Sequence, residues 1–226
     1  MSVPKNKNTL SKNEEDYLKA IFHLTFEIGE KTAGTNQLAQ DLGISPASVT
    51  GMIKKLKTKK LVDSEKYGKL KLTKEGFAFA TMLVRKHRLW ETFLYQHLNF
   101  TWDEVHEVAE QLEHIKSPKL IEQLDIYLGK PKSDPHGDAI PDENGLFSLS
   151  TKISLDKVPL GKKCKVVSVK DSSVAFLQLV SKLGIGINSN IQIIDRQEFD
   201  GTLVIDIDGE KKHVSSKFAK NVFVRE

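Results

Sequence analysis

The sequence is short of the features that mark secreted, membrane-embedded and cysteine-rich proteins. Its 226 residues contain one cysteine, Cys164, which excludes an intramolecular disulfide and a cysteine-rich zinc module. No apolar run approaches the roughly 18 residues of a membrane span, and the N-terminal stretch lacks the apolar core of a secretory signal. We therefore expect a cytoplasmic protein with no membrane partner, large enough for one large domain or two to three small ones.

Charge is distributed unevenly along the chain, although the net charge is only +4. Residues 44–74 contain nine lysines and two acidic residues, whereas residues 77–146 contain seven basic and twelve acidic residues. The first segment is predicted to meet an anion and the second to hold cations. Charge runs are more often solvated faces than binding surfaces. The motifs within each segment must therefore show whether it binds a ligand.

The N-terminal segment follows the order of a winged helix. A capping box that begins at Ser11 opens a helix over residues 12–28. Two further helices, over residues 35–42 and from residue 45 onward, are joined through a tight glycine turn, as in a helix-turn-helix. Two β-capable runs within residues 61–73 predict a hairpin, which would be the wing.

The third predicted helix is the candidate DNA-reading element. Small or hydroxyl-bearing residues on its first turns allow close approach to base edges, and they are Ser45, Pro46, Ala47, Ser48, Thr50 and Gly51. Lysines placed to reach phosphates follow on the helix and the wing, namely Lys54, Lys55, Lys57, Lys66 and Lys69. A lysine-rich helical hairpin is the alternative interpretation, but the order of cap, turn, helix and wing favours double-stranded DNA. No Arg or Gln faces the groove, so apolar contacts and DNA shape would carry specificity.

The rest of the chain is predicted to form a helical domain and a β domain. Helical patterns cover residues 77–98, 102–114 and 118–128, and a Pro-, Gly- and Asp-rich linker follows over 129–145. Short strands then alternate with turns around one short helix, which predicts a small all-β barrel of about 70 residues. The predicted fold is multi-domain α+β, with domains at residues 1–76, 77–146 and 147–226.

Metal-capable side chains recur at helical spacing on two predicted helices: His87 and Glu91 on one, and His106, Glu110, Glu113 and His114 on the other. Residues three or four apart share one helix face, so each group points one way. One such group is usually a solvated face, whereas two facing helices in an acidic segment make a solvated face and a metal site comparable interpretations. Carboxylates and imidazoles without thiolate suit Mn²⁺ or Fe²⁺, and also accept Zn²⁺ or Co²⁺.

The same residues complete no catalytic motif. The sequence HEVAE has Glu where the zinc-protease motif needs its second His, and EQLEH lacks the leading His of the inverted motif. A metalloenzyme would also need an open coordination position and a general base. We therefore expect a protein that is not an enzyme. A winged-helix regulator that senses a non-metal ligand is the other alternative.

The order of five stretches is informative: NEEDYLKAIFHL, ISPASVTGMIKKL, VRKHRLWETFL, VHEVAEQLEH and DPHGDAIP. Together they resemble the diphtheria toxin repressor family of metal-dependent transcriptional regulators, closest to its manganese-responsive branch. The resemblance covers almost the whole chain. It implies a homodimeric repressor of metal-uptake genes that is activated by Mn²⁺ and binds a palindromic operator. It also implies that the C-terminal domain is SH3-like, similar to that of the iron-transport protein family.

The resemblance also assigns ligands. Around the principal metal it places Asp16, His87, Glu110, Glu113 and His114, and at a weaker accessory site Glu91, His106, Asp134, His136 and Asp171. The iron-responsive branch has Met and Cys where this chain has Asp16 and Glu110, and hard ligands favour manganese. An acidic ligand of the two-domain manganese regulators falls on Lys19, which argues against a binuclear site of that form. An Fe²⁺-responsive regulator of the same family is the alternative.

Overall fold

The computed structural model describes residues 10–29, 32–64, 69–148, 151–170 and 173–225. The chain divides into two compact units, the first made of residues 1–87, 113–116 and 141–147, the second of residues 88–112, 117–140 and 148–226. None of the helices in the described ranges combines the length and the apolar character that crossing a membrane requires.

The first unit is built around helix α1 (Lys12–Phe22), which continues into one π-helical turn, η1 (His23–Glu27). The predicted capping box is present. Ser11 Oγ accepts the backbone N–H of Glu14, and the Glu14 carboxylate accepts the N–H of Ser11. Because both bonds satisfy N–H groups that a helix start leaves unpaired, the first turn of α1 is fixed from within. The apolar face of α1 lies in the core of the unit.

Helices α2 (Thr35–Asp41) and α3 (Pro46–Thr58) form the predicted helix-turn-helix. Ser45 caps α3, and its Oγ accepts the N–H of Ser48. The turn between the helices is closed by Gly43 at φ +65°, a conformation that favours glycine. The geometry of α3 therefore follows from the cap and the turn chemistry of the sequence.

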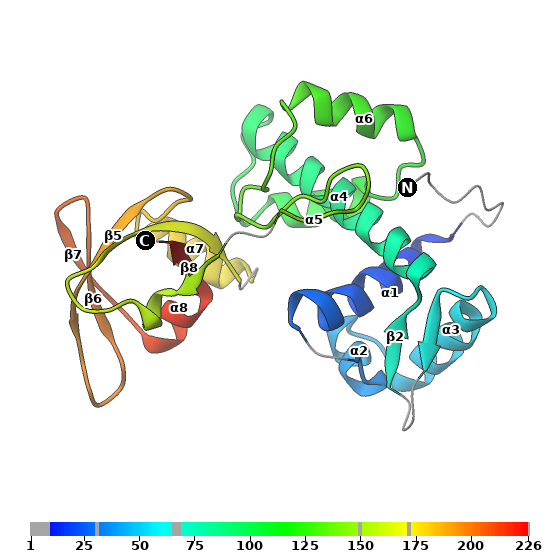
Figure 1. Ribbon diagram of the computed structural model, residues 1–226, viewed down its shortest axis with the longest axis horizontal. Helices are drawn as coiled ribbons and strands as arrows, with labels where there is room; N and C mark the ends of the chain where they lie inside the picture. Colours follow the sequence, from blue (N-terminus) through cyan, green and yellow to red (C-terminus); the bar gives the residue numbers. More distant parts are fainter. Residues whose placement is uncertain (1–9, 30–31, 65–68, 149–150, 171–172, 226) are drawn as a thin grey trace. The chain divides into compact units, whose positions relative to one another are not determined.

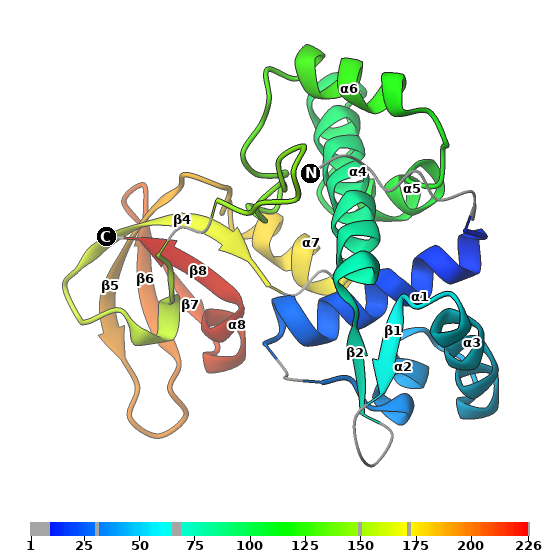
Figure 2. The same ribbon diagram turned by 45° about the vertical axis from the view of Figure 1, so that its right-hand side comes forward.

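The wing is an antiparallel hairpin of β1 (Val62–Ser64) and β2 (Leu70–Leu72). Figure 2 shows it beside α3, as the order of motifs predicts for a winged helix. The predicted tip of the wing, including Lys66, lies outside the described residues.

Helix α4 (Lys74–His97) begins directly after the wing. Thr73 Oγ1 accepts the N–H of Gly76 and so caps α4, which begins three residues before the predicted start at residue 77. A Cβ atom added at Gly76 would lie 1.9 Å from the carbonyl oxygen of Leu61. Only glycine fits this contact, because the obstacle is backbone that cannot rotate away.

The end of the predicted linker, residues 141–145, belongs to the first unit together with the next two residues. The ring of Phe147 lies 5.8 Å from that of Phe22 and 5.0 Å from that of Phe26, between centroids. Arg85 donates a hydrogen bond to the carbonyl oxygen of Pro141. The linker prediction is therefore incomplete here, because one aromatic side chain and one arginine hold the segment in place.

The second unit contains helices α5 (Val105–Leu112) and α6 (Pro118–Tyr127). The prediction of a helix from Trp102 to His114 is too long at both ends. Trp102 is buried in the core of the β domain, and its carbonyl oxygen accepts a hydrogen bond from a histidine side chain. Residues 113–114 form a turn after α5.

The C-terminal domain has one six-stranded antiparallel sheet of order β3–β8–β4–β5–β6–β7 (Figure 1). The strands are β3 (Ile153–Ser154), β4 (Lys163–Val169), β5 (Asn190–Arg196), β6 (Leu203–Ile207), β7 (Glu210–Val214) and β8 (Val222–Arg225). They are joined by the 3₁₀ turn η3 (Leu155–Lys157) and the helices α7 (Val174–Lys182) and α8 (Ser216–Asn221). The predicted strands and the one predicted helix are present, whereas β3, β8 and α8 were not predicted.

The fold class is confirmed: a winged helix-turn-helix, a helical segment and a C-terminal SH3-like β domain follow one another along the chain. The domain boundaries stay a prediction.

Candidate metal centres and nucleic-acid interface

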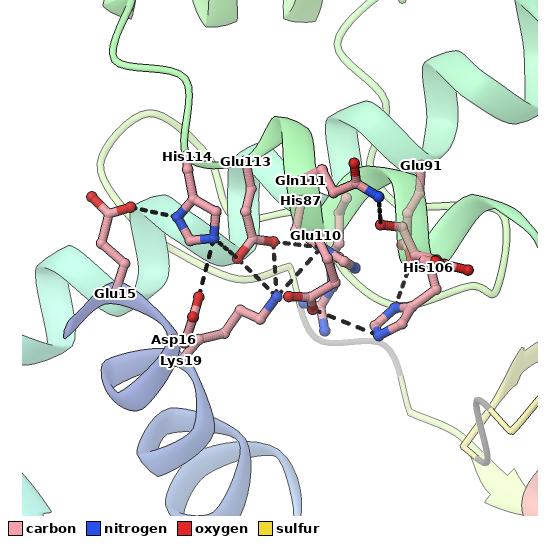
Figure 3. A network of polar contacts seen from close by, with 12 residues as sticks. Glu15, Asp16, Lys19, His87, Glu91, His106, Glu110, Gln111, Glu113 and His114 are labelled. Carbon is pink, nitrogen blue, oxygen red and sulfur yellow. Dashed lines mark hydrogen bonds and ion pairs between the residues drawn. The ribbon is translucent and has the colours of Figure 1, made fainter. Parts of the chain in front are cut away.

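Four of the five predicted principal ligands lie together in the first unit (Figure 3). Asp16 comes from α1, His87 from α4, and Glu113 and His114 from the turn after α5. His114 Nε2 is 3.0 Å from Asp16 Oδ1 and 3.9 Å from Glu113 Oε1. His87 Nδ1 is 2.6 Å from Glu113 Oε2. Asp16 and His114, the first and last of these residues in the sequence, are thus brought into contact.

The centre of this group is the carboxylate of Glu113, which is completely buried. Lys19 Nζ donates to its two oxygens over 2.9 and 2.8 Å. Burial raises the pKa of the Glu113 carboxyl, but the hydrogen bond with His87 and the charge of Lys19 outweigh it and leave the pKa below its usual value. Glu113 is therefore an ionised, oriented carboxylate. The ammonium of Lys19 has the opposite charge to the acid that a binuclear site of the two-domain kind would need here.

The two ring nitrogens of His114 have different surroundings: Nδ1 contacts Glu15, and Nε2 faces the carboxylates of the cluster. Its Nδ1 is 2.6 Å from Glu15 Oε2, which selects the tautomer with the proton on Nδ1. Its Nε2 is buried and makes no hydrogen bond to any residue that the structure describes. A buried nitrogen that makes no hydrogen bond is costly. Since Asp16, Glu113 and His114 offer ligand atoms within 4.8 Å of one another, a divalent cation fits this position.

Glu15 is the functional contact that sequence reasoning missed. It is 8% exposed and holds the imidazole of His114 by the side away from the cluster. Such a carboxylate fixes the ring orientation of a ligating histidine and raises its basicity. The run of three acids, residues 14–16, was the available signal, but acids at a helix start are also favoured by the macrodipole.

Glu110 belongs to the second unit, whereas the other four principal residues belong to the first. There Glu110 Oε1 lies 3.6 Å from His106 Nε2, one helical turn away on α5. Both side chains are partly exposed. The place of Glu110 among the principal ligands therefore stays a prediction.

Three of the predicted accessory residues form a second cluster, within the second unit. Glu91, Asp134 and His136 are all buried and offer ligand atoms within 4.8 Å of one another. Glu91 Oε2 is 3.9 Å from His136 Nδ1, and Glu91 Oε1 is 3.3 Å from His106 Nδ1. The fifth predicted accessory ligand, Asp171, lies outside the described residues.

The turn that carries the second cluster is shaped by Asp134. Its Oδ1 accepts the N–H groups of His136 and Asp138 over 2.8 and 3.0 Å. Burial raises the pKa of Asp134, and the charges of Asp138 and Glu91 raise it further. His136 Nε2 lies 2.9 Å from the carbonyl oxygen of Trp102, so this nitrogen donates and Nδ1 is left as the acceptor on the side of Glu91. One imidazole nitrogen and two carboxylates suit a hard divalent cation.

The predicted DNA-contacting residues at the start of α3 are all exposed: Ser45, Pro46, Ala47, Ser48, Thr50 and Gly51. On the opposite face, Val49, Ile53 and Leu56 are buried and anchor the helix in the core. Lys54 and Lys69 are exposed, and Lys57 donates a hydrogen bond to Ser64 Oγ on β1. The arrangement leaves the start of the helix open to a major groove.

Lys55 differs from the other predicted phosphate contacts because it pairs with an acid. The carboxylate of Glu14, 1% exposed, lies 3.3 Å from Lys55 Nζ and 2.7 Å from Lys59 Nζ. Burial raises the pKa of Glu14, but hydrogen bonds from Lys59, Ser11 and Lys55 outweigh it and lower the pKa to about 2. The carboxylate of Glu14 thus neutralises part of the positive charge at the end of α3.

Three family models match the chain. The model of the iron dependent repressor N-terminal DNA binding domain matches residues 9–70, and that of the iron dependent repressor metal binding and dimerisation domain matches residues 73–142. The FeoA domain model matches residues 153–226. The three matches follow the order of the winged helix, the helical segment and the β domain.

Similar proteins include regulators named for two metals. A solved manganese-dependent transcriptional repressor in complex with manganese is 34% identical with a TM-score of 0.85, and the match covers 93% of this chain and 98% of that one. An uncharacterized HTH-type transcriptional regulator of Methanocaldococcus jannaschii is 34% identical over 123 residues, 54% of this chain and 98% of the relative. The iron-dependent repressor IdeR of Mycobacterium leprae is 27% identical over 217 residues, 90% of this chain and 92% of the relative. Two other curated relatives are matched over only 30% and 52% of their own lengths.

Proposed function

Since the chain belongs to the iron dependent repressor family of metal-dependent, DNA-binding transcriptional regulators, we propose that it is a repressor activated by Mn²⁺. The observation that carries this proposal is the buried Nε2 of His114, which faces the carboxylates of Asp16 and Glu113 and has no hydrogen bond within the described chain. The proposed ligands of the principal metal are Asp16, His87, Glu110, Glu113 and His114.

Manganese is proposed over iron because of the donor atoms. The cluster offers oxygen and imidazole nitrogen, and Asp16 and Glu110 stand where the iron-responsive branch has sulfur ligands. Hard oxygen donors suit Mn²⁺, although Fe²⁺ binds most such sites more tightly. Affinity for the protein therefore does not identify the activating metal. The activating metal is identified by which ion stimulates DNA binding most strongly. An Fe²⁺-responsive regulator is the alternative.

The mechanism that we propose uses α1 as the moving part. Asp16 lies on α1, which packs in the core with the helix-turn-helix, whereas His87, Glu113 and His114 belong to the helical segment that follows. A bound cation would supply the positive charge that holds these groups in the arrangement the structure shows, with His114 Nε2 3.0 Å from Asp16 Oδ1 and 3.9 Å from Glu113 Oε1. Lys19 keeps Glu113 ionised and oriented before that, and Glu15 keeps His114 turned toward the site.

Metal binding then selects one placement of the winged helix rather than creating new contacts with DNA. We propose that two chains form a homodimer, so that two α3 helices enter successive major grooves roughly 34 Å apart on a palindromic operator. Exposed apolar residues on α6, Leu120, Ile126 and Tyr127, are candidates for the dimer surface. The cluster of Glu91, Asp134 and His136, with His106, is proposed as an accessory cation site. A regulator of this kind acts in the cytoplasm, where its operator is.

A DNA-binding titration tests the proposal. A duplex is selected from a random pool with the protein and Mn²⁺, and its affinity is then measured by fluorescence anisotropy with Mn²⁺, Zn²⁺, Co²⁺, anaerobic Fe²⁺ or chelator. We expect Mn²⁺ to tighten binding about 5- to 150-fold, the usual size of an allosteric coupling. The variants Glu113→Gln and His114→Ala should lose this stimulation while staying folded. Equal affinity with Mn²⁺ and chelator would remove the metal switch, and stronger stimulation by Fe²⁺ would favour the iron alternative.

A further inference from the structure

The first turn of α1 carries three consecutive acids whose partners lie in different places. Glu15 and Asp16 contact His114 of the candidate metal centre, over 2.6 and 3.0 Å. The preceding residue, Glu14, instead contacts the end of the recognition helix α3, where Lys59 Nζ is 2.7 Å from its carboxylate. Adjacent residues of one helical turn therefore touch the metal centre and the DNA-reading helix.

The Glu14 contact is buried and geometrically defined. Its carboxylate is 1% exposed, and Oε2 accepts the backbone N–H of Ser11 over 2.8 Å. Oε1 faces Lys59 at 2.7 Å and Lys55 at 3.3 Å. A buried carboxylate needs its cations, so α3 cannot separate from the first turn of α1 without leaving a charge unpaired. The hydrogen bond from the backbone N–H of Ser11 to Glu14 Oε2 ties the carboxylate to that turn, and it does not depend on the Ser11 side chain.

We propose that Glu14 is the positioning residue that transmits the state of the candidate metal centre to the recognition helix. The inference rests on the proposed function, because it names the path by which metal occupancy alters DNA binding. A cation held by Asp16 and His114, whose facing atoms lie 3.0 Å apart, would fix the first turn of α1 against His114. Glu14 would be fixed with that turn, and its ion pairs with Lys59 and Lys55 would hold α3 in the matching position.

Glu14 has a second effect in the same path. It neutralises two lysines of α3 that would otherwise be available to DNA phosphates, and each phosphate contact steepens the salt dependence of binding. Loss of its charge should therefore strengthen binding without metal and weaken the response to metal. A purely structural role would instead lower DNA affinity equally with and without Mn²⁺.

The test compares Glu14→Gln with Ser11→Ala. Glu14→Gln keeps the size of the side chain and removes the charge that holds Lys59 and Lys55. Ser11→Ala removes the hydroxyl cap of the same turn and leaves those ion pairs in place. Both are measured for Mn²⁺ affinity, for DNA affinity with Mn²⁺ and with chelator, and for the salt dependence of DNA binding.

We expect Glu14→Gln to bind Mn²⁺ as the wild type does, while its Mn²⁺ stimulation of DNA binding falls to about a third of the wild-type ratio or less. Without metal, its DNA affinity should depend more steeply on salt concentration, by the amount that corresponds to about one additional phosphate contact. Ser11→Ala should keep the wild-type ratio. If Glu14→Gln does not fold, Lys59→Gln, which breaks the same pair at the partly exposed lysine, should show the same loss of stimulation.

Wild-type stimulation in the folded Glu14→Gln or Lys59→Gln protein would overturn the inference, and so would loss of Mn²⁺ binding in Glu14→Gln, which would place Glu14 in the metal centre itself. These outcomes are distinct from failure of the proposed function. In that case the wild-type protein itself would show no response of DNA binding to Mn²⁺.

Discussion

His114 Nδ1 lies 2.6 Å from Glu15 Oε2, and the opposite nitrogen of the same ring lies 3.0 Å from Asp16 Oδ1. Two successive residues of α1 thus hold one imidazole from both sides. Because Glu15 takes the proton-bearing nitrogen, Nε2 keeps its lone pair and faces the carboxylates. The geometry makes Glu15 an orienting residue and Asp16 a proposed ligand.

The first prediction concerns Glu15. Glu15→Gln should weaken Mn²⁺ binding by about 10- to 100-fold, the usual effect of losing the partner of a ligating histidine. Electron paramagnetic resonance of free Mn²⁺ in a titration measures the change. Glu198 is an exposed acid of the C-terminal domain, so Glu198→Gln is the matched control and should bind as the wild type does. An unchanged affinity in Glu15→Gln would show that His114 is oriented by other means.

The second prediction concerns Lys19, whose ammonium compensates the buried charge of Glu113. Lys19→Met should destabilise the metal-free protein by about 1–3 kcal/mol, because a buried hydrogen-bonding group loses a partner. Bound Mn²⁺ should replace the missing charge, so the melting temperature of the variant should rise on Mn²⁺ addition by more than that of the wild type. Thermal melts with Mn²⁺ and with chelator measure both. Equal shifts in the two proteins would mean that the cation does not reach Glu113.

The third prediction separates two neighbouring lysines of α3. Lys54 is exposed on α3, whereas Lys55 pairs with Glu14 at 3.3 Å. Lys54→Ala should lower affinity for all DNA sequences and reduce the salt slope by about one contact. Lys55→Ala should reduce it less, because its charge is partly used by Glu14. Anisotropy at several salt concentrations compares the two variants; a larger effect at Lys55 would contradict the structure of this interface.

The fourth prediction concerns two glycines. Gly76→Ala should be strongly destabilising, since its Cβ would lie 1.9 Å from a backbone carbonyl oxygen of Leu61. Gly51 lies inside α3 with nothing within 4 Å of an added Cβ. Gly51→Ala should therefore stabilise the protein by about 0.5–1 kcal/mol through helix propensity. Urea unfolding of both variants measures the difference, and a stable Gly76→Ala protein would show that α4 can move away from the wing.

Local rules were enough to predict much of the fold. The caps at Ser11 and Ser45, the turn at Gly43 and the strand pattern near Tyr67 each depend on a few adjacent residues, and the helices and strands follow them. The strand β8 was missed because its apolar run directly follows α8 with no turn signal between them.

Contacts between residues far apart in the sequence could not be predicted from caps, turns and local patterns. Trp102 looked like a helix residue because its pattern is helical, but it is buried with the β domain. Phe147 directly follows the predicted linker and was assigned to the C-terminal domain, yet it packs on the rings of Phe22 and Phe26. The pair of Glu14 and Lys59 joins two elements whose separate patterns are complete without it. The ligand set was predictable in part, because it depends on spacing within helices and on a family resemblance.

Reciprocity between metal and DNA tests the central claim most directly. If the metal selects the DNA-binding conformation, DNA must tighten Mn²⁺ binding by the same factor by which Mn²⁺ tightens DNA binding. We would measure the Mn²⁺ dissociation constant by calorimetry with and without a saturating amount of the selected duplex. The account predicts a decrease of about 5- to 150-fold when DNA is present. The same dissociation constant in both conditions would contradict it.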